Sequence, residues 1–412
     1  MTGDDRDGMG CQRRGPRVVI VGFTYYPDDP RIRRQAEALV EDGYRVSVLC
    51  LRRPGETASA EFNGVRIVRL PVTKQRQSVA SYVKGYAFFF LHALAALSLM
   101  HLRERLSLVQ FFNIPDFLVF SAILPKLFGT PLVFDYRDAM PDQYVSKYGL
   151  PWRHPTIVLL CAIERAAMRF CDHVVTVHEP YRRLAIERGA RPEEVSIFMN
   201  FPDPNLFDRA KYADRVPEDR RFRVMYHGTI APRFDLDTVL QAVKILQPRI
   251  PCLEVEIIGD GDARESLRAQ ARRLGIDQIV SIPGPIPLNE VPARIARADV
   301  GLAPAKPDML EDLVLSTKLL EYLAMGKPVV ASRRTILLDY VGEEALLYYD
   351  SGDAAGLAER IHRLYLDPGE RSRLLAAGDA FMQRYPWREI KRQYLQVVAN
   401  LVKWSPIPAA LR

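Results

Sequence analysis

The chain has 412 residues, of which 48% are hydrophobic and 26% are charged, and its formal net charge is +7 at pH 7. This length predicts two or three domains of ordinary size, each with enough apolar residues for its own core. The positive excess fits partners that carry negative charge, namely phosphorylated small molecules, anionic lipid or nucleic acid. Because the basic residues are scattered and form no nucleic-acid-binding motif, we expect no nucleic acid among the partners.

The cysteines and the N-terminus exclude further classes. The five cysteines form no C-x-x-C pair and no Cys/His cluster, which argues against a disulfide framework or a structural zinc site and favours reduced thiols. Residues 1–16 lack the apolar stretch of a secretory signal and are predicted to be a disordered tail. We therefore expect a cytoplasmic protein.

Strand-like and helix-like segments alternate from residue 17 onward, which predicts parallel sheets with helices on both faces. In the first unit, a strand at 17–23 is followed by a helix that begins at Pro30, with Asp28 or Asp29 as its cap, and ends at Gly43. Further strands of this first half are predicted at 45–51, 107–112, 131–136 and 173–177.

The longest apolar run, Tyr86 to Met100, has 15 residues and is shorter than the roughly 20 needed to cross a bilayer. It predicts either a buried helix or an interfacial helix on an anionic membrane. The basic residues that favour the second interpretation are Lys74, Arg76, Lys84, Arg103 and Arg105. We prefer the buried helix, because large α/β proteins bury such segments routinely. The interfacial alternative would place the protein at the inner face of a membrane.

A polar stretch at 208–221 is predicted to be a linker, after which the alternation restarts. Strands are predicted at 221–228, 253–259, 279–284, 299–304 and 328–332, with a helix at 236–246. The predicted fold is thus α/β, with two Rossmann-like doubly wound domains, 17–207 and 222–385, facing a cleft, and a last helix within 386–412. Ligands of such sheets bind beyond the carboxyl ends of the strands.

The segment "LVLSTKLLEYLAMGKPVVAS" carries the strongest local signal. Ser316 or Thr317 can cap a helix that Gly326 ends, and Lys318 adds a full charge to the partly positive helix N-terminus. This end is therefore suited to an anion. Glu321, one turn on, could accept hydrogen bonds from hydroxyl groups, so the pair would fit a nucleotide. The alternative is an ordinary capped surface helix.

Two other strand ends bear on the same ligand. No G-x-G-x-x-G and no P-loop follow the first strand, which disfavours dehydrogenases and P-loop NTPases. In "YHGTIAPRFDLD", Gly228 lets a ligand approach the backbone, and Arg233 could flank a diphosphate together with Lys318. The alternative for Arg233 is a surface arginine. The D-x-D at Asp260 to Asp262 resembles a metal motif, but we expect Asp262 to be a helix N-cap.

The first half offers charged residues at two strand ends. Asp135, Arg137 and Asp138 follow one strand and predict either a site or a structural ion-pair network. His178 and Glu179 follow the next strand, where the histidine could carry a proton near neutral pH, although a structural histidine is the more common case.

Taken together, these stretches resemble glycosyltransferase family 4, the retaining sugar transferases of the GT-B fold. The likeness covers nearly everything from Arg17 to about Trp404, and it depends on the order and spacing of motifs that are individually loose. The motifs are "YYPDDPRIRRQAEAL", "FFNIPDFLV", "FDYRDAMPDQY", "TVHEPYRRLA", "MNFPDPNLF", "YHGTIAPRFDLD", "IIGDGD" and "STKLLEYLAMGKPVVAS".

The resemblance implies roles for individual residues. The glutamate matching Glu321 binds ribose hydroxyls in such enzymes, and Arg233 looks like the loop cation of the family's phosphate clamp. The implied donor site is Gly228, Thr229, Arg233, Gly259, Asp262, Ser316, Thr317, Lys318 and Glu321. The implied acceptor side is Asn113, Asp135, Arg137 and Asp138, and the implied catalytic residues are Arg233, Lys318, Asp138 and His178. The last helix is expected to cross back to the first domain.

The sequence departs from the family pattern at two positions. Leu313 stands where many members carry a first glutamate, for which Glu311 or Asp312 could substitute. Arg137 stands where many members have a histidine. These departures put the donor sugar and individual residue roles in doubt more than the activity.

The implied reaction moves a sugar from a nucleoside diphosphate sugar to a glycan or lipid-linked acceptor, with retained configuration, as in cell-surface polysaccharide or glycolipid synthesis. Cations at the diphosphate would replace a metal, so we expect neither metal nor other cofactor. Two alternatives remain: a sugar-nucleotide epimerase on the same fold, or a non-catalytic nucleotide-sugar-binding protein.

Overall fold

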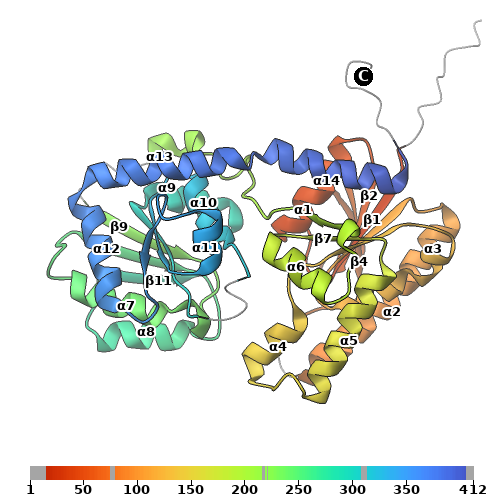
Figure 1. The fold of residues 1–412 in the computed structure, drawn as a ribbon, viewed down its shortest axis with the longest axis horizontal. Coiled ribbons are helices and arrows are strands. Elements are labelled where there is room, and N and C mark those ends of the chain that lie inside the picture. Colours follow the sequence, from red (N-terminus) through yellow and green to blue (C-terminus); the bar gives the residue numbers. More distant parts are fainter. Residues whose placement is uncertain (1–14, 75–78, 216–218, 220, 308–312, 405–412) are drawn as a thin grey trace, which may run out of the picture.

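The computed structural model describes residues 15–74, 79–215, 219, 221–307 and 313–404, which form two α/β units side by side (Figure 1). Each unit holds one sheet with helices on both faces, as the alternating pattern predicted. The first sheet has the strand order β3-β4-β2-β1-β5-β6-β7-β8, and the second has the order β11-β10-β9-β12-β13-β14. All pairs are parallel except the β3–β4 hairpin.

The elements of the first unit have the following bounds. Its strands are β1 (Arg17–Gly22), β2 (Arg45–Leu51), β3 (Ser59–Phe62), β4 (Val65–Leu70), β5 (Leu108–Phe112), β6 (Leu132–Asp135), β7 (His173–Thr176) and β8 (Val195–Ile197). Its helices are α1 (Pro30–Glu41), α2 (Val79–Arg103), α3 (Ile123–Leu127), α4 (Met140–Tyr148), α5 (Pro155–Phe170) and α6 (Glu179–Glu187), with short 3-10 helices η1 (Asp116–Ala122) and η2 (Pro192–Glu194).

The second unit follows the same plan. Its strands are β9 (Phe222–His227), β10 (Leu253–Ile258), β11 (Val280–Gly284), β12 (Val300–Ala303), β13 (Val329–Ser332) and β14 (Leu347–Tyr349). Its helices are α7 (Leu236–Leu246), α8 (Arg264–Arg273), α9 (Val291–Arg297), α10 (Thr317–Ala324), α11 (Thr335–Tyr340), α12 (Ala354–Leu366) and α13 (Pro368–Arg384), and its 3-10 helices are η3 (Arg209–Arg215), η4 (Pro232–Phe234) and η5 (Leu288–Glu290). The predicted linker, 208–221, includes η3, which lies beside α9.

Local chemistry explains the first unit's opening elements. β1 is a continuous apolar run in which every residue but the first is buried, as expected of a central parallel strand. Asp29 caps α1, because its Oδ1 accepts the backbone N–H of Arg31 at 3.0 Å, and Pro30 takes the first helical position. Gly43, at φ 92°, lets the chain turn into β2.

The predicted apolar run lies inside α2, which connects β4 to β5. Phe89, Ala93 and Leu97 are fully buried against the sheet, whereas Phe88 and Leu91 on the opposite side are each 57% exposed. The prediction of a buried helix therefore holds for the inner face of α2 only, and it is wrong for the outer face, which is exposed. Within the described residues, one helical segment, Ser81–Arg103, is long and apolar enough to cross a membrane, with a mean hydropathy of 1.5 and 22% of that window buried.

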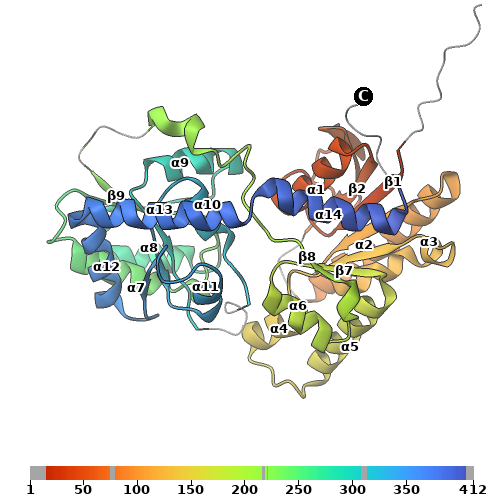
Figure 2. The ribbon, with the colours of Figure 1, turned by 45° about the horizontal axis from the view of Figure 1, so that its top comes forward.

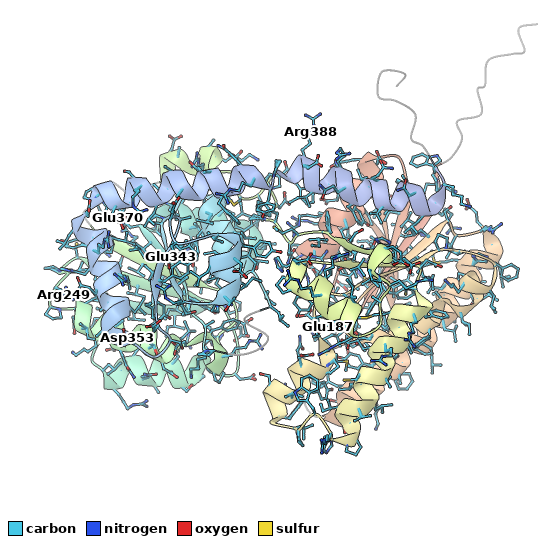
Figure 3. All side chains as sticks on the ribbon, in the orientation of Figure 1. Glu187, Arg249, Glu343, Asp353, Glu370 and Arg388 are labelled. Carbon is cyan, nitrogen blue, oxygen red and sulfur yellow. The ribbon has the colours of Figure 1, made fainter. Side chains whose placement is uncertain are left out.

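Two helices at the end of the chain connect the units. α13 runs along the second unit beside α10, and α14 (Trp387–Val402) continues across to the first unit (Figures 1 and 2). There the Tyr394 hydroxyl donates to Gln110 Oε1 on β5 at 2.7 Å, and the Phe198 and Tyr394 rings pack with centroids 4.8 Å apart. The outer face of this helix pair points to solvent, as Arg388 shows (Figure 3). The last helix therefore completes the first unit.

Candidate functional site

The carboxyl ends of the two sheets meet at a cavity of about 560 Å³, the edge at which doubly wound sheets bind ligands. Its first-unit lining is Asp138, Gln143 and Tyr181, and its second-unit lining is His227, Gly228, Thr229, Arg233, Phe234, Ile258, Gly259, Asp260, Pro285, Ile286, Leu288, Val291, Val314, Ser316, Thr317, Lys318 and Glu321. Every predicted donor residue except Asp262 thus lines one cavity.

Two glycines bring backbone to the wall of this cavity. Gly228 has φ 130°, and a Cβ there would lie 3.1 Å from Lys318 Cε. Gly259 has φ 149°, and a Cβ there would lie 1.7 Å from the carbonyl oxygen of Gly228, so only glycine fits. The loops after β9 and β10 therefore pack backbone against backbone. A ligand can approach their main-chain groups closely.

Two cations meet at one aromatic ring beside the helix N-terminus. Lys318, in the first turn of α10, is 8% exposed, and its Nζ lies 4.1 Å from the centroid of the Phe234 ring and 3.4 Å from the Tyr226 hydroxyl. The guanidinium carbon of Arg233 lies 4.8 Å from the same Phe234 centroid. These charges, together with the partly positive end of α10, create a site for a di-anion.

The start of α10 differs in one detail from the prediction. Ser316 occupies the N-cap position with extended backbone, but its side chain makes no capping hydrogen bond. Thr317 is the first helical residue, and Gly326, at φ 65°, follows the helix end as predicted. Both hydroxyls line the cavity, so both are placed to bind a ligand there.

Glu321 is held by His227, a residue that was not among the predicted site residues. Its Oε2 lies 2.5 Å from His227 Nε2, and the His227 ring packs edge-on against Tyr322 at 4.8 Å. His227 is 6% exposed, and its Nδ1 is buried without a hydrogen-bond partner in the described structure. The available signal was the position of this histidine, directly before Gly228 at the end of β9. His227 therefore fixes the carboxylate that faces the cavity.

Asp262 was expected to be the N-cap of a helix and to lie in the donor site, and both expectations are wrong. The N-cap of α8 is Ala263, and Asp262 is exposed, one residue earlier and off the cavity lining. Asp260 is the member of the D-x-D that reaches the cavity, and its carboxylate pairs with Arg264 at 3.1 Å. In the part of the chain that the structure describes, no three His, Cys, Asp or Glu side chains gather as a metal site would require.

On the first-unit side, Asp135 and Arg137 pair with each other and do not line the cavity. Asp135 is fully buried and Arg137 is 5% exposed, and Arg137 Nη2 donates to Asp135 Oδ2 at 3.0 Å. Gln35 Nε2 and Gln110 Nε2 donate to the same oxygen at 2.8 and 3.2 Å. The structural-network alternative therefore describes these two residues, because both carboxylate oxygens of Asp135 accept hydrogen bonds from buried side chains.

Asn113 orders the loop that presents Asp138. Asn113 is 7% exposed, and its Oδ1 accepts the backbone N–H groups of Arg137 and Asp138 at 3.1 and 3.3 Å. Asp138 is the one predicted acceptor-side residue on the cavity lining, and its Oδ1 accepts from Gln143 at 3.1 Å. Arg31 Nη1, at the start of α1, lies 3.6 Å from Asp138 Oδ2, a contact that no local sequence pattern predicted.

His178 does not fit the role of a proton carrier. It is 1% exposed, and both ring nitrogens lack hydrogen-bond partners in the described structure. Burial, with the nearby charge of Arg137, lowers its pKa to about 3, and His178 does not line the cavity, so the alternative of a structural histidine describes it. The His178 ring packs against Tyr340 of the second unit at 5.6 Å, and the Tyr340 hydroxyl accepts the backbone N–H of Glu179 at 2.8 Å. His178 and Glu179 therefore lie at a contact between the two units.

The position of the missing first glutamate, Leu313, can be placed in the structure. Leu313 is partly buried and packs against the apolar core of the first unit, so it bridges the two units. Glu311 and Asp312, the suggested substitutes for the first glutamate, lie outside the described residues.

Comparison with known proteins places both halves in sugar-transferase families. A family described as "Glycosyl transferase 4-like domain" matches residues 29–200, and one described as "Glycosyl transferases group 1" matches residues 221–367. The chain is 25% identical to the 2-deoxystreptamine glucosyltransferase of Streptomyces kanamyceticus over 84% of its own length and 92% of the relative's.

Other relatives match over a shorter stretch. The chain is 29% identical to the GDP-mannose-dependent alpha-(1-6)-phosphatidylinositol monomannoside mannosyltransferase of Mycolicibacterium smegmatis over 45% of its own length, and it spans half of that protein. Among solved structures, sucrose-phosphate synthase from Thermosynechococcus elongatus superposes with a TM-score of 0.73, at 18% identity, over 95% of this chain and all of the other. Anabaena HepE in complex with UDP and glucose superposes with a TM-score of 0.70, at 16% identity, over 93% of this chain and all of the other. The two-unit fold is shared with both.

Proposed function

The chain belongs to the group 1 glycosyltransferases and has the GT-B fold, and from this premise we propose that it moves a sugar from a nucleoside diphosphate sugar to a glycan or lipid-linked acceptor with retained anomeric configuration. The family membership agrees with the resemblance seen in the sequence. The epimerase and non-catalytic alternatives find no support among these relatives, which are named as transferases.

One observation carries the proposal: Lys318, Arg233 and the N-terminus of α10 converge on one end of a cavity that Glu321 also lines. A nucleoside diphosphate needs both features, because its phosphates require cations and N–H donors while its ribose hydroxyls require an acceptor. The paired His227 keeps Glu321 in one orientation, which suits a carboxylate that accepts two hydroxyl hydrogen bonds.

The chemistry follows from where charge develops. In the transfer, the bond between the sugar's anomeric carbon and the diphosphate breaks, a bond from the acceptor oxygen to that carbon forms, and the proton of the acceptor hydroxyl passes to the departing diphosphate. The departing diphosphate gains negative charge, and Lys318, Arg233 and the helix end would stabilise it where water is excluded. These cations can do the work of a metal, so we propose that transfer requires none.

The acceptor would enter from the first-unit side of the cavity. Asp138, Gln143 and Tyr181 line that side, and the carboxylate of Asp138 can bind a sugar hydroxyl. The named relatives act on an aminocyclitol and on a phosphatidylinositol mannoside, so both soluble and lipid-linked acceptors occur among them. We propose a cytoplasmic location, in line with cysteines that show no disulfide in the described residues.

The test is nucleotide-induced thermal stabilisation, followed by product detection. UDP, GDP, dTDP, CDP and ADP are each added to the wild type and to Glu321→Ala, with EDTA or with Mg²⁺. We expect one nucleotide to raise the melting temperature of the wild type equally in both conditions and to lose most of this effect in the variant.

The matching sugar nucleotides are then incubated with candidate acceptors, and the anomeric configuration of the product is read by NMR. A retained linkage without metal supports the proposal. Stabilisation only with Mg²⁺, an inverted product, or no nucleotide effect would each overturn the corresponding part of it.

A further inference from the structure

The outer face of α2 is apolar from Phe88 to Leu102. Phe88 and Leu91 are each 57% exposed, Leu99 is 49% exposed and Leu102 is 68% exposed. With the exposed Ala95 between Leu91 and Leu99, successive positions are three or four residues apart and therefore lie on one side of the helix. Helices on the surface of a soluble domain ordinarily place polar side chains there, so an exposed apolar stripe of this length marks an interaction surface.

The neighbouring helix α3 extends the same surface. Ile123 and Leu127 are 49% and 78% exposed, and Phe128, which follows α3, is 54% exposed. Phe128 packs on His101 of α2 with ring centroids 5.4 Å apart, so the exposed apolar residues around α3 adjoin the C-terminal end of α2. Because these side chains are about half exposed or more, the described part of the chain leaves this side of α2 and α3 open to solvent. We name these seven residues, Phe88, Leu91, Leu99, Leu102, Ile123, Leu127 and Phe128, the docking face.

The charges around the docking face are positive. Lys84 stands near one end of α2 and Arg103 at the other, and both are exposed. The segment from Val79 to Arg103 contains no Asp or Glu. The next acidic residue, Glu104, is already engaged with Arg17 at 3.3 Å and also pairs with Arg45. An apolar centre with a cationic rim matches an anionic lipid surface, in which acyl chains lie beneath negative headgroups.

We propose that the docking face binds the surface of an anionic lipid bilayer, with α2 lying in the plane of the interface. The helix does not cross the bilayer, because Phe89, Ala93 and Leu97 on its inner face are fully buried in the core of the first unit. Crossing would remove these side chains from that core and separate β4 from β5, between which α2 is the connection. Lying flat keeps every core contact and buries only the exposed stripe.

A second copy of the chain is a poorer occupant of this face. A two-fold contact pairs identical surfaces, so it would bring the cationic rim of one copy, with Lys84 and Arg103, against the same rim of the other. Like charges at such a distance repel, whereas anionic headgroups attract both.

The position of α2 connects this surface to the cavity. Phe23, directly after β1 at the carboxyl edge of the sheet, packs on Tyr86 and Phe89 near the start of α2 with ring centroids 4.7 and 5.2 Å apart. That edge of the sheet also carries Asp138. A chain docked by α2 therefore holds the acceptor side of its cavity close to the lipid surface, which would suit a lipid-linked acceptor; this last step, unlike the docking itself, rests on the proposed function.

Binding to lipid vesicles tests the proposal without any assay of activity. The purified chain is sedimented with vesicles of phosphatidylcholine, alone or with about one third phosphatidylglycerol, in about 0.05 M and about 0.5 M salt. We expect at least roughly tenfold stronger binding to the anionic vesicles at low salt, and a large loss of this preference at high salt.

Two variants locate the surface. In L91E/L102E, two docking-face residues carry negative charge, and binding to anionic vesicles should fall by more than about tenfold. The matched control is Leu366→Glu, which changes a leucine of similar exposure (64%) at the end of α12 in the other unit, and which should bind as the wild type does. Both variants should keep the melting temperature of the wild type and its nucleotide-induced stabilisation, which separates failure of docking from failure of the sugar-nucleotide site.

A third variant measures how deeply the docking face enters the lipid. Phe88→Trp should show a blue-shifted emission on anionic vesicles and quenching by lipids that are brominated near the headgroup end of the acyl chain. The proposal is overturned if the wild type ignores anionic vesicles at low salt, if L91E/L102E binds as well as the wild type, or if the tryptophan stays in water. It is also overturned if light scattering shows a wild-type dimer that L91E/L102E abolishes while vesicle binding is absent.

Discussion

The two sides of the cavity are built from similar residues that are used in opposite ways. On the second-unit side, Lys318, Arg233 and Glu321 all line the cavity. On the first-unit side, Asp135 and Arg137 also follow a strand end, but they turn away from the cavity and pair with each other among buried glutamines. The comparison teaches that a charged residue after a parallel strand can serve a ligand or the scaffold, and that burial and partners decide between these uses.

The largest effect should come from breaking the buried pair. Asp135→Ala leaves the Arg137 guanidinium buried without its carboxylate, which should destabilise the protein by about 3–5 kcal/mol. Chemical denaturation monitored by fluorescence measures this loss. The exposed Asp262→Ala serves as the control and should stay within about 0.5 kcal/mol of the wild type. Equal stability of the two variants would mean that the first-unit charges are not a structural network.

On the second-unit side of the cavity, removing a charged side chain should lower activity and leave stability nearly unchanged. Lys318→Ala removes a cation from the phosphate end of the cavity, and we expect kcat to fall about 10²- to 10³-fold, as when one donor to a developing anion is lost. Sugar transfer under saturating donor measures this, beside the melting temperature. Lys244→Ala on α7 is the matched control, since Lys244 is exposed and bonds to Gln247 on the surface of the second unit, away from the cavity lining. A Lys318 variant with full activity would remove the proposed phosphate site.

The buried histidine on the first-unit side predicts a pH effect on stability. The pKa of His178 is lowered to about 3 in the folded protein, below its ordinary value of about 6.5, so between these values the unfolded chain binds a proton that the folded chain does not. Stability therefore falls as pH falls, by about 2 kcal/mol at pH 5 from this group alone.

The variant His178→Leu cannot take up this proton. The difference in unfolding free energy between wild type and variant should hence change by about 2 kcal/mol between pH 7 and pH 5. Denaturant titrations at both values measure it. A constant difference across this range would mean that His178 titrates normally and is accessible to water, which would bring it back into consideration as a proton carrier.

The smallest effect concerns the histidine that holds Glu321. His227→Phe keeps a ring against Tyr322 but loses the bond to the carboxylate, and we expect KM for the sugar nucleotide to rise about five- to tenfold with kcat little changed. His227→Gln keeps an N–H donor near the Nε2 position and should restore most of the affinity. If Gln is no better than Phe, the contact does not position Glu321.

Much of the fold could be predicted because the central strands are long apolar runs bounded by glycine, proline or capping residues, as in β1, β9 and β10. The β3–β4 hairpin was missed although Asn63 and Gly64, at φ 48° and 75°, form the Asn-Gly turn typical of hairpins. β8 and β14 have three residues each, too few for a pattern to show.

The candidate site was predictable on one side only. The donor-side residues belong to three strand-to-helix segments, after β9, β10 and β12, and parallel strands bring such segments to one edge, so local motifs sufficed. The fate of Asp135 depends on Gln35 and Gln110, which come from other elements and carry no local signal. His227 was missed for the same reason, since its partner Glu321 is 94 residues away.

The docking of α14 has a consequence for how the chain is made. Gln110 lies at the centre of the first sheet, and the Tyr394 hydroxyl that it bonds is synthesised 284 residues later. At about 5–20 residues per second, translation needs on the order of tens of seconds to cover that interval. Throughout it, the first unit emerges from the ribosome without the helix that covers one side of its sheet. The first unit is therefore the earlier of the two to be made and the later to be finished, and chaperones acting on nascent chains should bind it until α14 has emerged.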